Sequence, residues 1–503
     1  MQHSSALNFR DFVDELVRDG DALIIDAEVD AHLEAAAVAR RVYESRGPAP
    51  VFNRVKGAAD GYRLMGAPAG MSGVDAGYGR IATHFGLPRA SGPRAIVEHL
   101  VAAMSAVPIS PRVVESGPVK EHVLTGGEVD LERFGVPTLH QQDGGRYFGT
   151  YGMHIVATPD GSWTSWSISR LMLRDSRSLV GPTIPTQHLG MIHRQWATLG
   201  KPTPWVFVLG APPAAIAAAG MPLPERVNED GYVGALVGEG VEVTKSELHD
   251  LMVPANAEIV VEGYIDHTAT DLEGPMGEYH GYQFDGAKPQ PIFHVEAITH
   301  RDRPILPFCV AGMPPEENHT IWGTMISASA LDLLRRAGLP VNFAWCSYEA
   351  ATCWIAVSIE LAALGRQPIA EQDLVRQVAD VLFNSHVGWL VPKVLLVADD
   401  VDVTDIDQLV WAMATRYRPG MGEYAFRDAP GFPLVPYLTD DDVANSRGGK
   451  SVMSLLQPEQ LATGRTHGIA AQFTTSFPDQ VQRTVIDRWA EYGFCALETS
   501  RRR

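Results

Sequence analysis

The middle of the chain constrains the fold most. From about residue 110 to 320 the sequence is rich in β-branched and aromatic runs joined by turns, with few helical patterns between them. It predicts a hairpin of 150–158 and 163–173, and a second hairpin of 292–299 and 305–310 around Arg301-Asp302-Arg303. A mixed sheet or a barrel accommodates such a stretch better than a helical bundle.

On both sides of this stretch, helical and strand patterns alternate. Near the N-terminus, Phe9 to Val17 repeat with helical spacing behind an Asn8 cap, 23–25 and 50–52 predict strands, and Asp30 is expected to cap a helix that ends at Tyr43. Beyond residue 325 the sequence predicts helices at 327–336, 372–383 and 409–417. It predicts strands at 341–348, 354–359 and 394–397. A loop at 419–436 and a last helix at 478–492 are expected to follow.

These patterns predict a mixed, α+β chain of four parts. We expect an N-terminal α/β segment at 1–108, a β-rich domain at 109–322, a C-terminal α/β domain at 323–475 and a terminal helix at 476–503.

Composition excludes several partners. Lys and Arg number 41 against 60 Asp and Glu, a formal charge of -19, which argues against nucleic acid and anionic membrane as partners. A local Arg can still bind an anionic substrate. The N-terminus has no apolar signal core and the most apolar stretch, 205–219, is cut by prolines, so a soluble, cytoplasmic protein without a membrane span is expected. The four cysteines, Cys309, Cys346, Cys353 and Cys495, form no metal motif, which favours reduced, buried thiols.

Arg170 closes the first chemically interesting segment, 163–170. If the whole segment is a strand, Ser165, Ser167 and Ser169 share one face, and Trp166, Ile168 and Arg170 share the other. An Arg beside apolar neighbours is either reaching for solvent or pointing into a site. Both interpretations stay open on this segment alone.

Two carboxylates frame a Gly-Pro-Met-Gly turn, Glu273 and Glu278. This spacing does not suit a regular helix, and the turn can bring both side chains to one cavity. Paired carboxylates near an Arg suit general acid catalysis, because burial raises one pKa while the cation keeps the other group ionised. The alternative is two solvated loop acids.

Single residues such as His188, Glu229 and Lys393 are candidate metal or phosphate contacts but say little alone. The chain has no GxGxxG fingerprint, Walker loop, G-x-S-x-G elbow or H-E-x-x-H motif. The usual nicotinamide, nucleotide-triphosphate, serine-hydrolase and zincin hypotheses therefore lose their main support.

Taken in order, the motifs resemble the UbiD family of decarboxylases that use a prenylated flavin, and are nearest its ferulic (phenylacrylic) acid decarboxylase branch. The matching segments are 163–170, Gln187-His188, 221–224 with Glu229, 253–260, 273–282, 391–393 and 487–494. The resemblance covers nearly the whole chain. It implies a split β-barrel-like flavin-binding domain in the middle and a C-terminal α/β oligomerisation domain.

The resemblance implies a catalytic network of Arg170, Glu273 and Glu278. Glu278 would protonate the carbon left when CO2 departs, Glu273 would orient Arg170, and Arg170 would meet the substrate carboxylate and the flavin. In the family the flavin accepts the electrons of the breaking bond.

The resemblance also implies cofactor and metal contacts. The implied cofactor contacts are Ser165, Ser167, Ile168, Ser169, Arg170, Gln187, His188, Glu229 and Lys393. His188 and Glu229 would hold a divalent cation, usually Mn2+, and the backbone carbonyls of Trp166, Ala218 and Met221 would hold K+. One departure concerns Ser165, where the family has a metal-binding Asn; a serine hydroxyl is a weaker ligand for a hard cation.

The implied substrate pocket contains Tyr279, His319, Trp322, Phe432 and Leu434. A flat aromatic or heteroaromatic acid could stack on Tyr279 and Trp322, or these rings only pack the wall. The resemblance further implies a flavin prenyltransferase as supplier of the cofactor and a homodimer or higher homo-oligomer.

Three classes of function are weighed. The first is reversible decarboxylation of an aromatic, heteroaromatic or arylacrylic acid, with a polyprenyl-hydroxybenzoate-type or other α,β-unsaturated acid as the alternative within the family. The second is a metal-dependent hydrolase built on His188 and Glu229. The third is a non-catalytic flavin-binding or assembly protein, which the intact Arg170, Glu273 and Glu278 disfavour.

Overall fold

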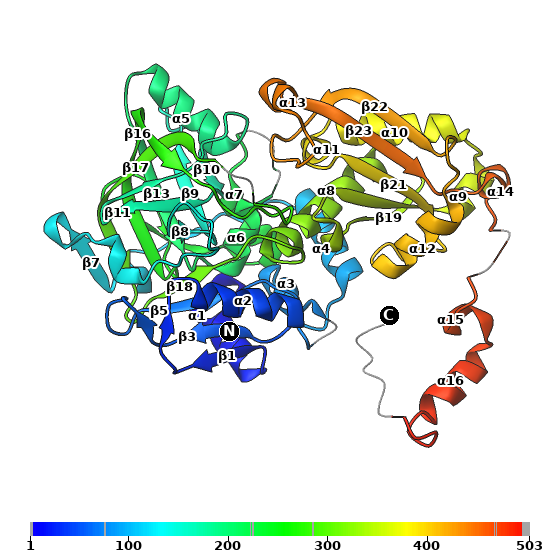
Figure 1. Cartoon of the computed structure of the whole chain (residues 1–503), viewed down its shortest axis with the longest axis horizontal. Helices are drawn as coiled ribbons and strands as arrows, with labels where there is room; N and C mark the ends of the chain where they lie inside the picture. The colour runs from blue at the N-terminus through cyan, green and yellow to red at the C-terminus, as the bar shows by residue number, and fades with distance from the viewer. Residues whose placement is uncertain are drawn as a thin grey trace. The chain divides into compact units, whose positions relative to one another are not determined.

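The chain forms two compact units, residues 1–325 and 326–503 (Figure 1). The computed structural model describes residues 4–74, 77–221, 223, 226–283, 286–466, 468 and 470–494. Strands and helices are mixed in both units, so the predicted mixed fold class is confirmed.

An N-terminal layer begins the first unit. Helix α1 (Phe9–Arg18) starts where the Asn8 side chain accepts hydrogen bonds from the N–H groups of Arg10 and Asp11. Its apolar stripe, which includes Phe12 and Leu16, packs on a sheet in the order β1-β3-β5-β18. The strands and helices of this layer are β1 (Ala22–Ile25), β2 (Val29–Asp30), α2 (Glu34–Ser45), β3 (Ala49–Phe52), β4 (Val55–Lys56), β5 (Arg63–Gly66), α3 (Gly79–His84), α4 (Pro93–Ser105) and β18 (Ile305–Phe308).

Helix α2 begins later than the sequence predicted. Asp30 lies in the short strand β2, and its side chain accepts a hydrogen bond from the N–H of His32. Leu33 is the residue before the helix and has a positive φ of 71°. The Asp30 carboxylate therefore stabilises a turn ahead of the helix, and the expected cap at this residue is wrong.

The central part of the first unit is a curled sheet in the order β10-β9-β13-β16-β17-β12-β11-β8, with β7 paired to β17 (Figure 1). All of these pairings are antiparallel. Its strands are β7 (His122–Thr125), β8 (Tyr147–Gly149), β9 (Gly152–Ala157), β10 (Thr164–Ser167), β11 (Leu171–Asp175), β12 (Ser178–Val180), β13 (Thr203–Leu209), β16 (Ile259–Glu273) and β17 (Lys288–His300). Around it lie β6 (Arg112–Val113), α5 (His188–Thr198), α6 (Pro213–Ala219), α7 (Glu229–Val237), β14 (Glu242–Lys245) and β15 (Met252–Pro254).

Both predicted hairpins need correction. β9 and β10 pair as expected, but the second strand stops at Ser167 and resumes as β11, which pairs with β12 and β8 instead. The turn at 301–303 exists, yet β18 leaves the central sheet and runs parallel to β5 in the N-terminal layer. Local turn chemistry identified the bends, whereas long-range pairing decided which strands meet.

The second unit has a sheet in the order β19-β20-β21-β23-β22. Its elements are β19 (Val341–Cys346), β20 (Trp354–Ile359), α9 (Leu361–Arg366), α10 (Glu371–Phe383), α11 (His386–Leu390), β21 (Lys393–Ala398), α12 (Ile406–Arg416), β22 (Glu423–Pro430), α13 (Asp440–Asn445), β23 (Arg447–Ser454), α14 (Pro458–Thr463), α15 (Phe473–Ser476) and α16 (Asp479–Asp487), and α8 (Gly323–Arg336) leads into it. The expected loop at 419–436 is wrong in part, because β22 lies within it. This strand escaped prediction because it is an edge strand in which only Ala429 is buried, and it contains the charged residues Glu423, Arg427 and Asp428.

Three cysteines are free thiols, with Cys309 and Cys346 buried and Cys353 partly buried, while Cys495 lies outside the described residues. Within the described part of the chain, no helix is long and apolar enough to cross a membrane.

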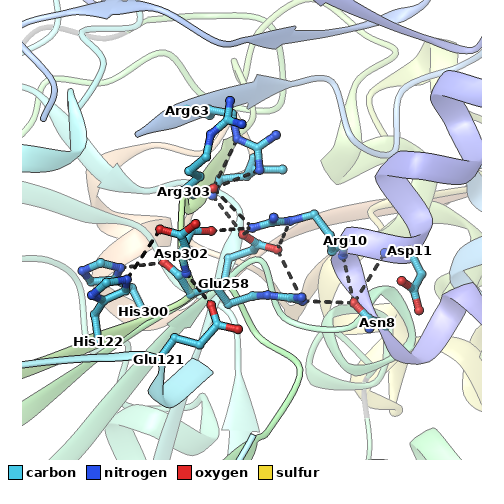
Figure 2. Close-up of polar contacts among 12 residues, drawn as sticks. Asn8, Arg10, Asp11, Arg63, Glu121, His122, Glu258, His300, Asp302 and Arg303 are labelled. Carbon is cyan, nitrogen blue, oxygen red and sulfur yellow. Dashed lines mark hydrogen bonds and ion pairs between the residues drawn. The ribbon is translucent and has the colours of Figure 1, made fainter. Parts of the chain in front are cut away.

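A buried ion pair joins α1 to the strands behind it. Figure 2 shows Arg10 reaching Glu258, which precedes β16. The fully buried Glu258 carboxylate accepts from Arg10 Nε at 2.9 Å and Nη2 at 2.5 Å, and from the N–H of Ile305 at 3.0 Å. One carboxylate thus ties the N-terminal helix to the starts of β16 and β18.

Arg10→Ala should lower the free energy of unfolding by about 3 kcal/mol, because it leaves the buried Glu258 carboxylate with only the more distant Arg301 guanidinium, 3.8 Å away, as a cationic partner. Urea-induced unfolding measures the change. Arg41→Ala is the control, because the Arg41–Glu44 pair is exposed and should change the free energy by less than about 1 kcal/mol. Equal changes in the two variants would contradict the role given to Glu258.

Candidate functional site

Arg170 lies in the short connection that closes the curled sheet. β10 stands at one end of the strand order and β11 stands near the other, and only residues 168–170 connect them. Four residue steps span at most about 14 Å, so the two ends of the sheet must curl toward each other. The expectation that Arg170 shares a strand face with Trp166 and Ile168 is therefore wrong, because the strand ends at Ser167.

The Arg170 guanidinium binds two carboxylates. Its Nε and Nη2 donate to the two oxygens of Glu273 at 2.8 and 3.1 Å, and its Nη1 donates to Glu278 Oε1 at 2.5 Å. Glu273 is the last residue of β16, and Glu278 lies in the following turn. The structure thus brings together the three residues that the sequence singled out, and neither carboxylate is a freely solvated loop acid.

Neighbouring segments hold the turn that carries Glu278. The N–H of Gly144 donates to Pro275 O at 2.8 Å, and a Cβ at Gly144 would lie only 2.0 Å from Gly274 O. Asp143 accepts hydrogen bonds from the N–H of Gly277 and the side chain of Gln283. The close approach at Gly144 requires a residue without a side chain, and it fixes the turn against the segment before β8.

Burial and charge shift the pKa values of Glu278 and Arg170. Burial raises the pKa of Glu278, and the Arg170 guanidinium opposes this rise without cancelling it. Burial disfavours the charged form of Arg170, but attraction to Glu278 and Glu273 outweighs this effect and raises its pKa. Arg170 therefore stays a cation, while Glu278 retains its proton to a higher pH than an ordinary carboxyl group.

Tyr147 was not anticipated from the sequence. Its hydroxyl donates to Glu273 Oε1 at 2.9 Å, and burial raises its pKa, so the hydroxyl keeps its proton. Tyr147 reaches Glu273 because β8 pairs with β11 at the closing edge of the sheet. No local motif marks this residue, since the contact depends on the pairing of distant strands.

Ser165, His188 and Glu229 form a second cluster. Glu229 Oε1 accepts from Ser165 Oγ at 3.2 Å and lies 3.1 Å from His188 Nδ1, which is 3.4 Å from Ser165 Oγ. The other oxygen, Glu229 Oε2, accepts the N–H of Trp166 at 2.8 Å. Octahedral ligands at about 2.1 Å from an ion stand about 3 Å apart, so these oxygen and nitrogen donors fit a divalent cation.

The segment between the two clusters has features that suit a bound cofactor. Ser167 Oγ is buried and has no hydrogen-bond partner within the described residues, and Ile168 is partly exposed. Gln187 precedes α5, whose first residue is His188. An orphaned hydroxyl three residues before Arg170 fits the sequence prediction that a polar ligand is bound here.

Ala218 lies in the last turn of α6, and Met221 follows the end of this helix. Ala218 O accepts the N–H of Met221, and Met221 O accepts the N–H of Leu223. Each carbonyl retains a second lone pair, so their role as K+ ligands with Trp166 stays a prediction. Pro222 and Pro224 of this motif lie outside the described residues.

Tyr279, His319 and Trp322 lie together beside Glu278. The Tyr279 ring meets Trp322 edge to face at 5.7 Å. His319 is fully buried, with Nε2 2.6 Å from Tyr279 O and Nδ1 accepting the N–H of Glu316 at 3.0 Å. Both ring nitrogens of His319 thus have partners, so it supports Tyr279, and its place in the pocket wall stays a prediction.

Three predicted site residues belong to the second unit. Lys393 begins β21 with its Nζ 5.2 Å from the Tyr437 ring centroid, Phe432 is buried against Trp389, and Leu434 is partly buried. Their contacts with flavin or substrate stay predictions.

Family models for 3-octaprenyl-4-hydroxybenzoate carboxy-lyase match the chain in three parts. The N-terminal domain model matches residues 13–100, the Rift-related domain model 112–314 and the C-terminal domain model 319–454.

Curated relatives match over almost the full length. The pyrrole-2-carboxylic acid decarboxylase of Pseudomonas aeruginosa is 58% identical, covering 97% of this chain and 99% of that protein. Ferulic acid decarboxylase 1 of Saccharomyces cerevisiae is 38% identical, with 97% and 99% covered. Among solved structures, the UbiD-class enzyme HmfF of Pelotomaculum thermopropionicum in complex with FMN has a TM-score of 0.78 at 25% identity, covering 92% of this chain and 97% of that one.

Ser165→Asn should tighten Mn2+ binding, because an amide carbonyl is a better ligand for a hard cation than a hydroxyl. A titration of the protein with Mn2+, followed by the paramagnetic resonance of the free ion, measures the affinity. Ser162→Asn is the control, because Ser162 lies in the exposed turn before β10. If Ser165→Asn binds Mn2+ no better than the wild type, Ser165 is not at the metal.

Proposed function

This chain belongs to the UbiD family of carboxy-lyases, and we propose that it catalyses the reversible, non-oxidative decarboxylation of an aromatic, heteroaromatic or arylacrylic acid with prenylated FMN. The observation that carries the proposal is the Arg170 guanidinium shared between the buried Glu273 and the partly buried Glu278. Pyrrole-2-carboxylate is the first substrate to test, since it is the substrate named for the relative with 58% identity. A polyprenyl-hydroxybenzoate-type acid is the alternative within the family.

The described residues offer contacts for the cofactor. His188, Glu229 and Ser165 would hold a divalent cation, proposed to be Mn2+, and Ser167 would offer its buried hydroxyl to the flavin. When bound, prenylated FMN supplies an electron sink for the charge left as CO2 departs. Support for this cofactor comes from the neighbouring structures of HmfF, which hold FMN and, in an evolved dimeric form, prenylated FMN.

Arg170 would bind the substrate carboxylate in place of Glu278. Glu273 contributes two hydrogen bonds to the guanidinium and is nearly fully buried, while Glu278 contributes one and keeps 15% of its side chain exposed. The more exposed and singly bonded partner is the easier one to displace. A bound carboxylate would therefore compete with Glu278 and leave the Glu273–Arg170 pair intact.

Displacement would prepare Glu278 as the acid. Without the guanidinium at 2.5 Å, the Glu278 carboxyl loses the contact that opposes its raised pKa, so it takes up a proton. The protonated group then stands beside the position from which CO2 leaves and can donate to the substrate carbon. In the reverse reaction the same group would remove the proton.

Further partners follow from the same proposal. A flavin prenyltransferase would supply the cofactor. The chain would form a homodimer or higher homo-oligomer through its C-terminal unit, where α16 buries no residue and exposes Val481 and Ile486.

The other classes of function have less support. The named relatives are decarboxylases, which sets the hydrolase hypothesis aside. The arginine held between two carboxylates disfavours a non-catalytic flavin carrier, because a carrier has no use for a buried acid beside a cation.

The protein should release CO2 from pyrrole-2-carboxylate only when it is reconstituted with prenylated FMN. Apo protein, protein with plain FMN and protein with prenylated FMN are assayed in parallel for CO2, with a vinyl and a phenolic acid as further substrates. Equal activity in all three preparations would remove the proposed mechanism.

Glu278→Gln should lower kcat by about 10²–10⁴-fold, because Gln keeps the shape and polar contact of Glu but cannot deliver a proton. Hydrogen exchange between the product and D2O should fall by a similar factor, since it is the same step in reverse. In the wild type, kcat should fall as pH rises through the raised pKa of Glu278, because only the protonated form donates.

Glu273→Gln serves as the comparison for Glu278→Gln. It should also lose activity, but through Arg170 and the cofactor, so its flavin absorption spectrum should change while that of Glu278→Gln should not. If Glu278→Gln keeps near-wild-type hydrogen exchange with D2O, another group must be the acid, and Glu273 is the first candidate.

A further inference from the structure

We propose that His154 is a positioning residue for Arg170 and acts through the backbone carbonyl of Ser169. His154 lies in β9, between β10 and β13 in the curled sheet, and its side chain is fully buried. Its Nε2 lies 3.1 Å from Ser169 O, one residue before the arginine. The inference rests on the proposed function of Arg170 and extends it to a residue whose hydrogen bonds go to Ser169 and Trp205.

The hydrogen bonds of His154 determine its tautomer. Trp205 Nε1–H donates to His154 Nδ1 at 2.9 Å, and an indole nitrogen can only donate. Nδ1 must therefore present a lone pair. In a neutral ring the proton then resides on Nε2, where it faces the Ser169 carbonyl, which can only accept. The ring is thus a fixed donor toward Ser169.

The surroundings keep this ring neutral. Trp205, Phe207 and Phe293 pack around it with ring centroids at 6.1, 4.7 and 5.8 Å. Burial among these rings lowers the pKa of His154 to about 4, against the weaker effect of the Ser169 carbonyl. Across the neutral pH range His154 therefore carries no charge that would repel the Arg170 cation.

Segment 168–170 needs such support because it belongs to no strand. Ser169 Oγ donates to Pro182 O at 3.0 Å, so the hydroxyl and the carbonyl of Ser169 are both held. On the other side, a Cβ at Gly181 would lie 2.4 Å from Arg170 O, so the chain at Gly181 lies close against Arg170. With Ser169 fixed at both groups, the Arg170 side chain starts from a defined backbone position.

The test compares three variants of the protein reconstituted with prenylated FMN and assayed on pyrrole-2-carboxylate. His154→Phe removes the donor, and His154→Gln can still donate to Ser169 O and accept from Trp205. His84→Phe is the matched control, because His84 is also fully buried with a pKa lowered to about 4 by burial, but it bonds to Arg80 O and Tyr151, away from the ion pair.

We expect His154→Phe to lower kcat/KM about tenfold, or about 1.4 kcal/mol, and to weaken the binding of an unreactive carboxylate by a similar factor. His154→Gln should recover most of both losses at unchanged flavin content. His84→Phe should lose thermal stability but keep kcat/KM. Unchanged kcat/KM and carboxylate affinity in His154→Phe, or equal losses in both Phe variants, would overturn the proposal.

A spectroscopic measurement on the wild type covers the case in which His154→Phe does not fold. In protein labelled with 15N-histidine, the His154 signals, assigned by their loss in His154→Gln, should show the Nε2–H tautomer and no titration between pH 8 and about 5. An Nδ1–H tautomer, or titration near the ordinary value of about 6.5, would overturn the proposal. Because this readout needs no turnover, it stands even if pyrrole-2-carboxylate is not the substrate.

Discussion

The site depends on one guanidinium shared between two carboxylates of unequal burial. Glu273 binds Arg170 through two hydrogen bonds and receives a third from Tyr147, whereas Glu278 has one contact with the cation and retains some exposure. This inequality separates the roles of two chemically identical groups. One carboxylate fixes the cation, and we propose that the other exchanges its partner and its proton.

The curl of the central sheet makes this arrangement possible. Because three residues connect β10 with β11, Arg170 lies where the two ends of the sheet approach each other. β16 ends at Glu273 on the same side, and β8 brings Tyr147 to the closing edge. The hydrogen bond between His154 and Ser169 O and the close approach of Gly144 to Gly274 then stabilise two short connections that lie outside the strands.

Sequence patterns predicted what depends on local chemistry. The Asn8 cap, the β9–β10 hairpin and the two carboxylates of the Gly-Pro-Met-Gly turn were visible in short segments, and the structure has them. The sequence did not indicate which strands and side chains far apart in the chain come into contact. β18 joins the N-terminal sheet and Arg170 leaves its strand because of pairings between residues far apart in the chain, and Tyr147 and His154 acquire their contacts in the same way.

Proton uptake on carboxylate binding tests the central claim most directly. If an unreactive analogue of the substrate displaces Glu278 from Arg170, Glu278 gains a proton. Calorimetric titrations in buffers of different ionisation enthalpy should then report net proton uptake in the wild type and none in Glu278→Gln. Binding without proton uptake in the wild type, or with equal uptake in both proteins, would contradict the exchange of partners at Arg170.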